Sequence, residues 1–206
     1  MPAQRQDANQ PTAETAASTS VRRLRRAERR EQVLTAATQA FARGGYAATS
    51  LDDIAAAAGI SRVLLYRHFD SKTDLYRAVL DRACTRLAEA TGTGNYTAAS
   101  IDALVGVAAA DPDAFRLLFH HAAREPEFRT EMDRFQETMV AVARRELAQM
   151  IPDSSWAAWA ARLAPTVAVE AVIAWLDAGQ PDREQAAQRI GQTLDGVIKA
   201  AQPPTG

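Results

Sequence analysis

Three serine residues spaced ten or eleven positions apart constrain this 206-residue chain more than any other feature. Ser50, Ser61 and Ser71 each precede residues that form helices well, and a serine hydroxyl accepts a hydrogen bond from a free N–H group at a helix start. Gly59 lies just before the second serine, where a sharp turn needs the positive φ that glycine adopts easily. The spacing predicts two short helices, over residues 51–58 and about 62–69, with the dimensions of a helix-turn-helix.

The rest of the chain also has helical periodicity. No long run alternates apolar and polar residues as a half-buried strand does, and alanine is the commonest residue. We therefore predict an all-α fold. The expected helices cover about residues 27–43, 51–58, 62–69, 71–90, 98–110, 112–123, 126–150, 156–178 and 182–201.

The second short helix has an unusual outer face. If Leu65 and Phe69 point inward, then at 100° per residue Val63 and Arg67 point nearly opposite. The flanking positions hold Arg62, Leu64, Tyr66 and His68, where an ordinary surface helix would carry Glu, Lys and Gln. Arginine can bind guanine with two hydrogen bonds, aliphatic side chains can touch thymine methyl groups, and tyrosine and histidine can donate to phosphates. We expect this face to bind DNA, with Lys72 at the next helix start as a phosphate ligand.

Charge is unevenly distributed along the chain. Residues 21–90 hold 13 Arg and Lys against 8 Asp and Glu, whereas residues 91–206 hold 10 against 15. A basic amino half joined to an acidic carboxyl half favours a polyanionic partner for the first half. Residues 22–30 alone carry six Arg and one Glu. They are interpreted as an arm along phosphates or in the minor groove, the alternative being a solvated, partly helical lead-in.

Other classes of protein are disfavoured by what the sequence lacks. Cys84 is the single cysteine, which excludes an internal disulfide framework and a Cys/His zinc module and favours a reducing compartment. The apolar stretch 163–176 is interrupted by Glu170 and is too short to span a bilayer, and the first twenty residues lack the apolar core of a secretory signal. We therefore expect a cytoplasmic protein without a membrane anchor, cofactor or metal, and not an enzyme.

The segment FARGGYAATSLDDIAAAAGISRVLLYRHFDSKTDL, residues 41–75, is similar to the amino-terminal DNA-binding domain of the TetR family of transcriptional regulators. The resemblance covers about residues 27–82 and is most specific in Gly59-Ile60-Ser61 and in the run from Leu65 to Lys72. It implies an all-helical homodimer. The amino-terminal helix-turn-helix domain would bind a palindromic operator, and a long helix would join it to a helical carboxyl-terminal domain for effector binding and dimerisation.

The same resemblance assigns DNA contacts to particular positions. The outward face of the second short helix adds its two outermost residues, Val63 and Arg67, to these positions. The full set of expected DNA contacts is Thr49, Ser61, Arg62, Val63, Leu64, Tyr66, Arg67, His68 and Lys72. Two positions depart from the family pattern: Val63 replaces the common Gly or Pro, and Asp52 replaces a common basic residue and would repel phosphate. As alternatives, Tyr66 could cover the first helix, His68 and Lys72 could be ordinary surface groups, and the serines could serve only as caps.

In the carboxyl half, residues 156–178 form a helix that is apolar nearly all round from Leu163 to Leu176, so it must be covered on most sides. A stripe on the last helix consists of Ile190, Leu194, Val197, Ile198 and Ala201. Helices 156–178 and 182–201 are therefore expected to form half of an intersubunit four-helix bundle, the alternative being burial within one subunit.

The expected effector pocket is drawn from the bulky residues of this half: Phe115, Phe119, His120, Met132, Phe135, Met139, Trp156 and Trp159. Aromatic and methionine side chains at helical spacing are more often core than ligand contacts, so packing is the alternative. With so apolar a lining, a small and largely apolar effector is expected.

Taken together, the sequence predicts a repressor that binds a palindromic operator as a homodimer and is released by a small effector. The alternative is a DNA-binding dimer without an effector, whose carboxyl domain serves dimerisation or a protein partner. The expected division is a disordered tail at 1–21, a DNA-binding domain at 22–82, an effector and dimerisation domain at 83–202 and a loose tail at 203–206.

Overall fold

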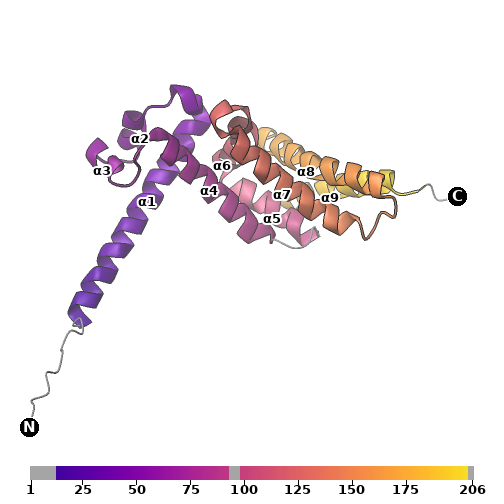
Figure 1. Cartoon of the computed structure of the whole chain (residues 1–206), viewed down its shortest axis with the longest axis horizontal. Helices are drawn as coiled ribbons and strands as arrows, with labels where there is room; N and C mark the ends of the chain where they lie inside the picture. The colour runs from indigo at the N-terminus through magenta and orange to yellow at the C-terminus, as the bar shows by residue number, and fades with distance from the viewer. Residues whose placement is uncertain (1–12, 93–97, 204–206) are drawn as a thin grey trace, which may run out of the picture.

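The computed structural model of the chain describes residues 13–92 and 98–203, with side chains from Arg26 onward in the first helix. Within those ranges every regular element is helical, which confirms the all-α fold (Figure 1). The helices are α1 (Ala13–Ala48), α2 (Leu51–Ala57), α3 (Arg62–Tyr66), α4 (Lys72–Thr91), α5 (Ala98–Ala110), α6 (Pro112–Arg116), α7 (Arg129–Leu147), α8 (Ser154–Asp177) and α9 (Arg183–Ala201). Helices α1–α3 lie at one end, α4 leads away from them, and α5–α9 form a bundle at the other end.

The three serine caps are all present. The Oγ atoms of Ser50, Ser61 and Ser71 accept hydrogen bonds from backbone N–H groups three residues on, at 3.1, 3.3 and 3.0 Å. At the first cap, the Asp53 carboxylate accepts a bond from the Ser50 hydroxyl and one from its backbone N–H, and these bonds lower the pKa of Asp53. Gly59 adopts a φ of 63° in the turn that follows α2. Local sequence signals therefore set the start of each short helix.

The first helix is longer than predicted, because it begins at Ala13 instead of about residue 27. Residues 13–21, expected as part of a disordered tail, are helical, which fits their alanine-rich composition. Tail residues 1–12 and 204–206 lie outside the described residues. Gly45 interrupts α1 with a φ of 75°, close to the predicted end of the helix.

Two later helices, by contrast, are shorter than predicted. The α-helical part of α3 stops at Tyr66 instead of Phe69, although the turn continues through a bond from Phe69 N–H to Leu65 C=O at 3.1 Å. The segment predicted as one helix over 112–123 is split into α6, a π-helical turn over Leu117–His121 and a 3-10 turn over Ala122–Arg124. A second 3-10 turn begins at Pro126, which lacks the N–H that a continuing helix needs.

The DNA-binding and carboxyl-terminal regions share one hydrophobic core. It joins buried side chains of α1 to α4 with Leu118, Phe128 and Met132 from the carboxyl half. The ring centroids of Tyr76 in α4 and Phe128 lie 4.4 Å apart, and those of Tyr76 and Phe41 in α1 lie 4.9 Å apart. The predicted boundary at residue 82 consequently falls inside α4, and packing is continuous across it.

Helix α8 is, by length and composition alone, long and apolar enough to cross a membrane. The sequence-based expectation differed because it considered only the shorter stretch 163–176. In the structure α8 packs against α7 and α9 and buries ten of its 24 residues in this chain, while residues such as Trp159 stay exposed. The predicted apolar stripe of α9 also faces inward: Ile190 and Ala201 are buried, while Leu194, Val197 and Ile198 pack against the chain's own core clusters. Much of the burial assigned to a second subunit is therefore supplied within one subunit.

Two glycines should respond oppositely to alanine substitution. A Cβ atom added at Gly59 or at Gly196 meets nothing within 4 Å, so only the backbone conformation distinguishes them. Gly59→Ala should lower the free energy of unfolding by about 1 kcal/mol, because its φ of 63° is unfavourable for alanine. Gly196→Ala, inside α9, should raise it by up to about 1 kcal/mol because alanine favours helix. Urea unfolding monitored by circular dichroism measures the free energy of unfolding of both variants. Equal changes of the same sign in the two variants would contradict the positive φ assigned to Gly59.

Candidate nucleic-acid interface

The outer face of α3 is open to solvent, as the sequence predicted. Leu65 is fully buried and Phe69 is 4% exposed, whereas Val63 is 67% and Tyr66 41% exposed. Ser61, Arg62 and Arg67 are also exposed, and Leu64 and His68 are half-buried at the edges. Val63 and Tyr66 are three residues apart and so lie on one face of the helix, and neighbouring apolar side chains on a surface can mark a contact with another molecule. We call Arg62, Val63, Tyr66 and Arg67 the recognition face.

Arg62 does not stand alone on this face. Its Nη1 lies 3.0 Å from Oδ2 of Asp52 on α2, its Nη2 donates to the Tyr66 hydroxyl at 3.4 Å, and its guanidinium lies 5.5 Å from the centre of the Tyr66 ring. The sequence indicated only that Asp52 would repel phosphate. In the structure Asp52 also holds the guanidinium that is expected to bind a base, and so links the two short helices across their open side.

Two residues that were predicted to contact DNA, Thr49 and Lys72, form hydrogen bonds within the protein instead. Thr49 is only 6% exposed, and its hydroxyl donates to the backbone carbonyls of Gly45 and Ala40 at 2.7 and 3.2 Å. The expected side-chain contact of Thr49 with DNA is therefore corrected to a structural role at the α1–α2 turn.

Lys72 is also turned inward. Its Nζ donates to the carbonyls of Tyr46, Ala47 and Thr49 at 2.9, 3.2 and 3.2 Å and lies 4.5 Å from the centre of the Tyr46 ring. An ammonium group has three donors, and here all three have acceptors. Instead of facing a phosphate, Lys72 in this structure ties the start of α4 to the end of α1 and to Thr49 just before α2.

The arginine-rich segment approaches the end of α3. Residues 22–30 are helical, and Arg30 places its guanidinium 5.2 Å from the centre of the Phe69 ring. Partial burial lowers the pKa of His68, and the charges of Arg26, Arg30 and Arg29 lower it further. His68 and the exposed end of this segment therefore belong to one basic surface that continues the recognition face.

The expected pocket residues are mostly core or surface. Phe115 and Met132 are buried, and Phe119 lies between the Phe115 and Phe135 rings, at 4.7 and 5.9 Å. Met139 is half-buried against buried side chains of α5, α8 and α9, and Nε2 of His120 lies 3.4 Å from Glu170 Oε1. Trp156 and Trp159 are 51% and 40% exposed, so neither is enclosed within this subunit, and their role in an effector pocket stays a prediction. Packing against neighbouring helices places the phenylalanines and methionines in or beside the core, whereas the two tryptophans stay exposed.

A small cavity does exist, between α4, α5 and α6. Its volume is about 130 Å³, and of the expected residues only Phe115 lines it. Leu118, one of the bulky residues of the carboxyl half, also lines it, and the rest of the lining comes from residues that carried no sequence signal, including Leu87 and Val107.

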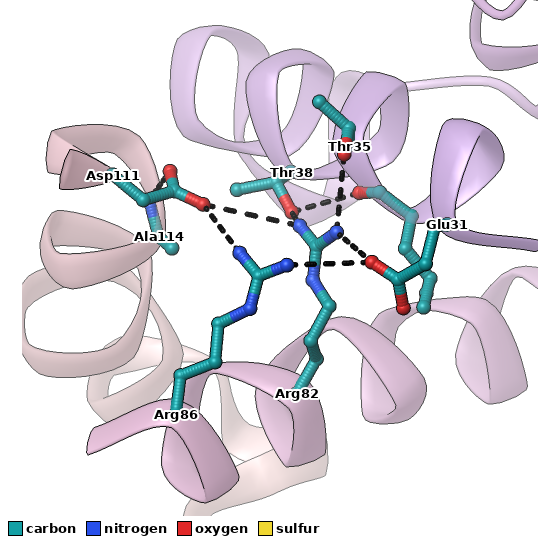
Figure 2. A network of polar contacts seen from close by, with 8 residues as sticks. Glu31, Thr35, Thr38, Arg82, Arg86, Asp111 and Ala114 are labelled. Atoms are coloured by element: carbon teal, nitrogen blue, oxygen red, sulfur yellow. Dashed lines mark hydrogen bonds and ion pairs between the residues drawn. The ribbon is translucent and has the colours of Figure 1, made fainter. Parts of the chain in front are cut away.

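A polar network beside this cavity was also missed (Figure 2). Arg82 and Arg86 extend from α4 toward Glu31, Thr35 and Thr38 on α1 and toward Asp111, which caps α6. We call these six residues the Arg82 network. The i,i+4 spacing of the two arginines places them on one face of α4, but nothing in the sequence indicates that Glu31 and Asp111 meet there.

Comparison with known proteins identifies the amino-terminal region. Residues 33–79 match the family described as bacterial regulatory proteins, tetR family. The HTH-type transcriptional activator FasR of Mycolicibacterium smegmatis is 40% identical to the chain over 107 residues, which cover 48% of the chain and 49% of FasR. The HTH-type transcriptional repressor BepR of Brucella suis is 40% identical over 57 residues, which cover 28% of the chain and 27% of BepR. The chain thus spans half or less of the length of these relatives.

The fold has relatives over most of its length. A TetR-like transcriptional regulator from Rhodococcus sp. RHA1 superposes with a TM-score of 0.71, covering 83% of this chain and 93% of that one. At 21% sequence identity this likeness establishes the fold. The matched family consists of regulators and not of enzymes, in agreement with the expectation from the sequence.

DNA affinity should depend on the protonation of His68. Neighbouring arginines and partial burial hold its pKa below the usual 6.5 in the free protein, and a nearby DNA phosphate would raise it. The complex then binds more protons than the free protein, so affinity should rise as the pH falls from about 8 to about 5. The expected gain is up to about tenfold for each unit by which the phosphate raises the pKa.

Fluorescence anisotropy of a labelled duplex across this pH range measures the effect. The control is His68→Gln, which cannot titrate and should flatten the pH dependence while leaving His120 and His121 in place. Identical pH profiles for the wild-type protein and the variant would remove His68 from the interface.

Proposed function

We propose that this chain, whose residues 33–79 match the tetR family of bacterial regulatory proteins, is a DNA-binding transcriptional regulator that acts as a homodimer. Each subunit presents α3 to a major groove, and the two grooves lie one helical turn apart on a palindromic operator. The observation that carries this proposal is the recognition face itself. Leu65 and Phe69 fix the helix from inside, so an arginine pair, a valine and a tyrosine are left open to solvent.

Bases and phosphates would be contacted by different groups. Arg62 is suited to a guanine edge and Val63 to a thymine methyl group, because both sit at the exposed start of α3. Ser61, Leu64, Tyr66, Arg67 and His68 form the surrounding contact surface. Arg26, Arg29 and Arg30 extend this surface toward phosphates or the minor groove.

The proposed dimer uses the outer side of α8. Trp159 is exposed, and Leu163 and Val167 are partly exposed at successive turns of the same helix. A second α8 packed on this side would cover those side chains and, with α9, would complete a four-helix arrangement about a twofold axis. The stripe of α9 originally expected at this interface is used within the subunit.

We propose the repressor form of regulation, with an effector that releases DNA. A bound dimer blocks the operator by occupancy alone and needs no further surface for the transcription machinery. The relatives named above include both an activator and a repressor. An effector would act by binding the DNA-free arrangement more tightly, and a hundredfold loss of DNA affinity requires about 2.7 kcal/mol of such preference.

The size of the cavity also favours a second candidate function, that of a DNA-binding dimer without an effector. At about 130 Å³ it is smaller than the few hundred cubic ångströms of a usual ligand pocket. This observation supports either a small effector or a DNA-binding dimer without one, in which the carboxyl domain serves dimerisation or a protein partner.

Selection of bound sites from random duplex DNA tests the function. We expect a palindrome with half-sites one helical turn apart. Arg62→Ala should relax base preference at one position in each half-site, with a loss of about 1–3 kcal/mol in discrimination. The control is Arg189→Ala, an exposed arginine on α9 that should leave the selected sequence unchanged.

Two results would contradict the proposal. Failure of the wild-type protein to enrich any sequence at low salt would exclude sequence-specific binding, and an asymmetric site of one half would exclude the dimer. Unchanged preferences in the Arg62 variant would show that this arginine does not contact a base.

A further inference from the structure

The cavity between α4, α5 and α6 has apolar walls and a charged end. Leu87, Val107, Phe115 and Leu118 contribute to the walls, while Arg82, Arg86 and Asp111 are its charged lining. An apolar cavity of about 150 Å³ holds benzene, so a volume of about 130 Å³ suits a compact apolar group of roughly that size.

The same two arginines also border a second, more open hollow. A groove of about 380 Å³ between α1 and α4 is lined by Arg30, Glu31, Leu34, Arg82 and Arg86, among others. Arg82 and Arg86 therefore stand between an apolar cavity and a polar groove that opens to solvent. A ligand with an apolar body and a polar head would place its head at this junction.

The two arginines are held very differently. The Arg82 side chain is 9% exposed and donates to Thr38, Thr35 and Glu31 at 2.8, 3.1 and 3.2 Å. Arg86 is 50% exposed and reaches the carboxylates of Glu31 and Asp111 only at 3.4 and 3.6 Å. An arginine paired bidentately with a carboxylate makes bonds of about 2.7–2.9 Å, so Arg86 has room for a better anionic partner.

We propose that Arg86, supported by Arg82, binds the anionic head of a small organic carboxylate whose apolar body fills the adjoining cavity. This inference rests on the proposed function, because it names the chemical class of the effector and the residues through which it acts. It also revises the sequence-based expectation of a largely uncharged effector, since the cavity residues that the sequence did not indicate include two arginines.

Binding at this site would alter the connection between the DNA-binding helices and the rest of the chain. The Arg82 network joins Glu31 on α1 to Asp111 at the start of α6, with α4 between them (Figure 2). A ligand carboxylate on Arg86 competes with both acidic side chains. Drawing Arg86 away leaves α1 held by Arg82 alone at this point, and the orientation of the recognition face relative to its partner subunit is then less firmly fixed.

Thermal unfolding of the full-length protein tests the binding site. The probes are two matched pairs, phenylacetate with phenylacetamide and benzoate with benzamide, in which the acid and the amide have nearly the same shape. At millimolar concentration we expect at least one acid to raise the Tm and to bind about tenfold more tightly than its amide. Arg86→Gln should reduce this ratio to within about twofold.

The matched control for this variant is Arg77→Gln. Arg77 is also on α4, is 46% exposed and is paired with Glu131 at 3.3 Å, but it does not line the cavity. It should keep the preference for the acid. Equal effects of acid and amide on the wild-type protein, absence of any stabilisation by either acid, or an unchanged preference in Arg86→Gln would each overturn the proposal.

A second measurement follows the coupling to DNA, by anisotropy on a duplex obtained by site selection. We expect the stabilising acid to lower wild-type DNA affinity by at least about fivefold. Glu31→Gln should still bind the acid but respond to it by less than about twofold, because the contact that the acid displaces is already weakened. An undiminished response in this variant would overturn the coupling.

The two hypotheses fail in different ways. If no duplex is selected, the proposed function fails while the acid–amide comparison still reports on the cavity. If a palindrome is selected but no acid binds in preference to its amide, the proposed regulatory function is retained and the carboxylate site is rejected.

Discussion

The burial of Leu65 and Phe69 is the constraint on which the interface depends. With these two side chains in the core shared by α1 and α4, a helix of little more than one turn can present only one face to solvent. That orientation determines which arginines are open to solvent, where Val63 and Tyr66 lie, and why Asp52 can reach Arg62. The caps at Ser50, Ser61 and Ser71 set where the short helices begin, and the buried pair decides how α3 is turned.

The second organising feature is α4, which belongs to both parts of the molecule. Its first turn is tied by Lys72 to three carbonyls near the α2 start, its middle is packed through Tyr76 against Phe128, and its later arginines contact α1 and α6. A rearrangement in the carboxyl half cannot easily leave the DNA-binding helices undisturbed, because packed cores shift between discrete arrangements instead of deforming smoothly. The proposed carboxylate site lies where such a rearrangement would meet α1.

The sequence was sufficient for features set by neighbouring residues, and insufficient for those set by distant ones. Caps, the Gly59 turn and the inward side of α3 were predicted because each depends on residues a few positions apart. The inward turn of Lys72 and the contact between Glu31 and Arg82 depend on partners 26 and 51 positions apart in the sequence, which only the fold brings together. The cavity was missed for the same reason: bulky residues such as Trp159 are prominent in the sequence but exposed, whereas the cavity is lined by residues of different helices that only the fold brings together, among them Arg82, Leu87 and Val107.

Hydroxyl-radical footprinting of the protein, free and bound to its selected duplex, tests whether the recognition face is where DNA binds. Tyr66 on the recognition face and Trp156 at the far end of the bundle are similarly exposed in the free chain, so the second residue is an internal control. We expect DNA to protect Tyr66 and His68 from oxidation and to leave Trp156 unchanged. Equal oxidation of Tyr66 with and without DNA would show that this face is not where the duplex lies.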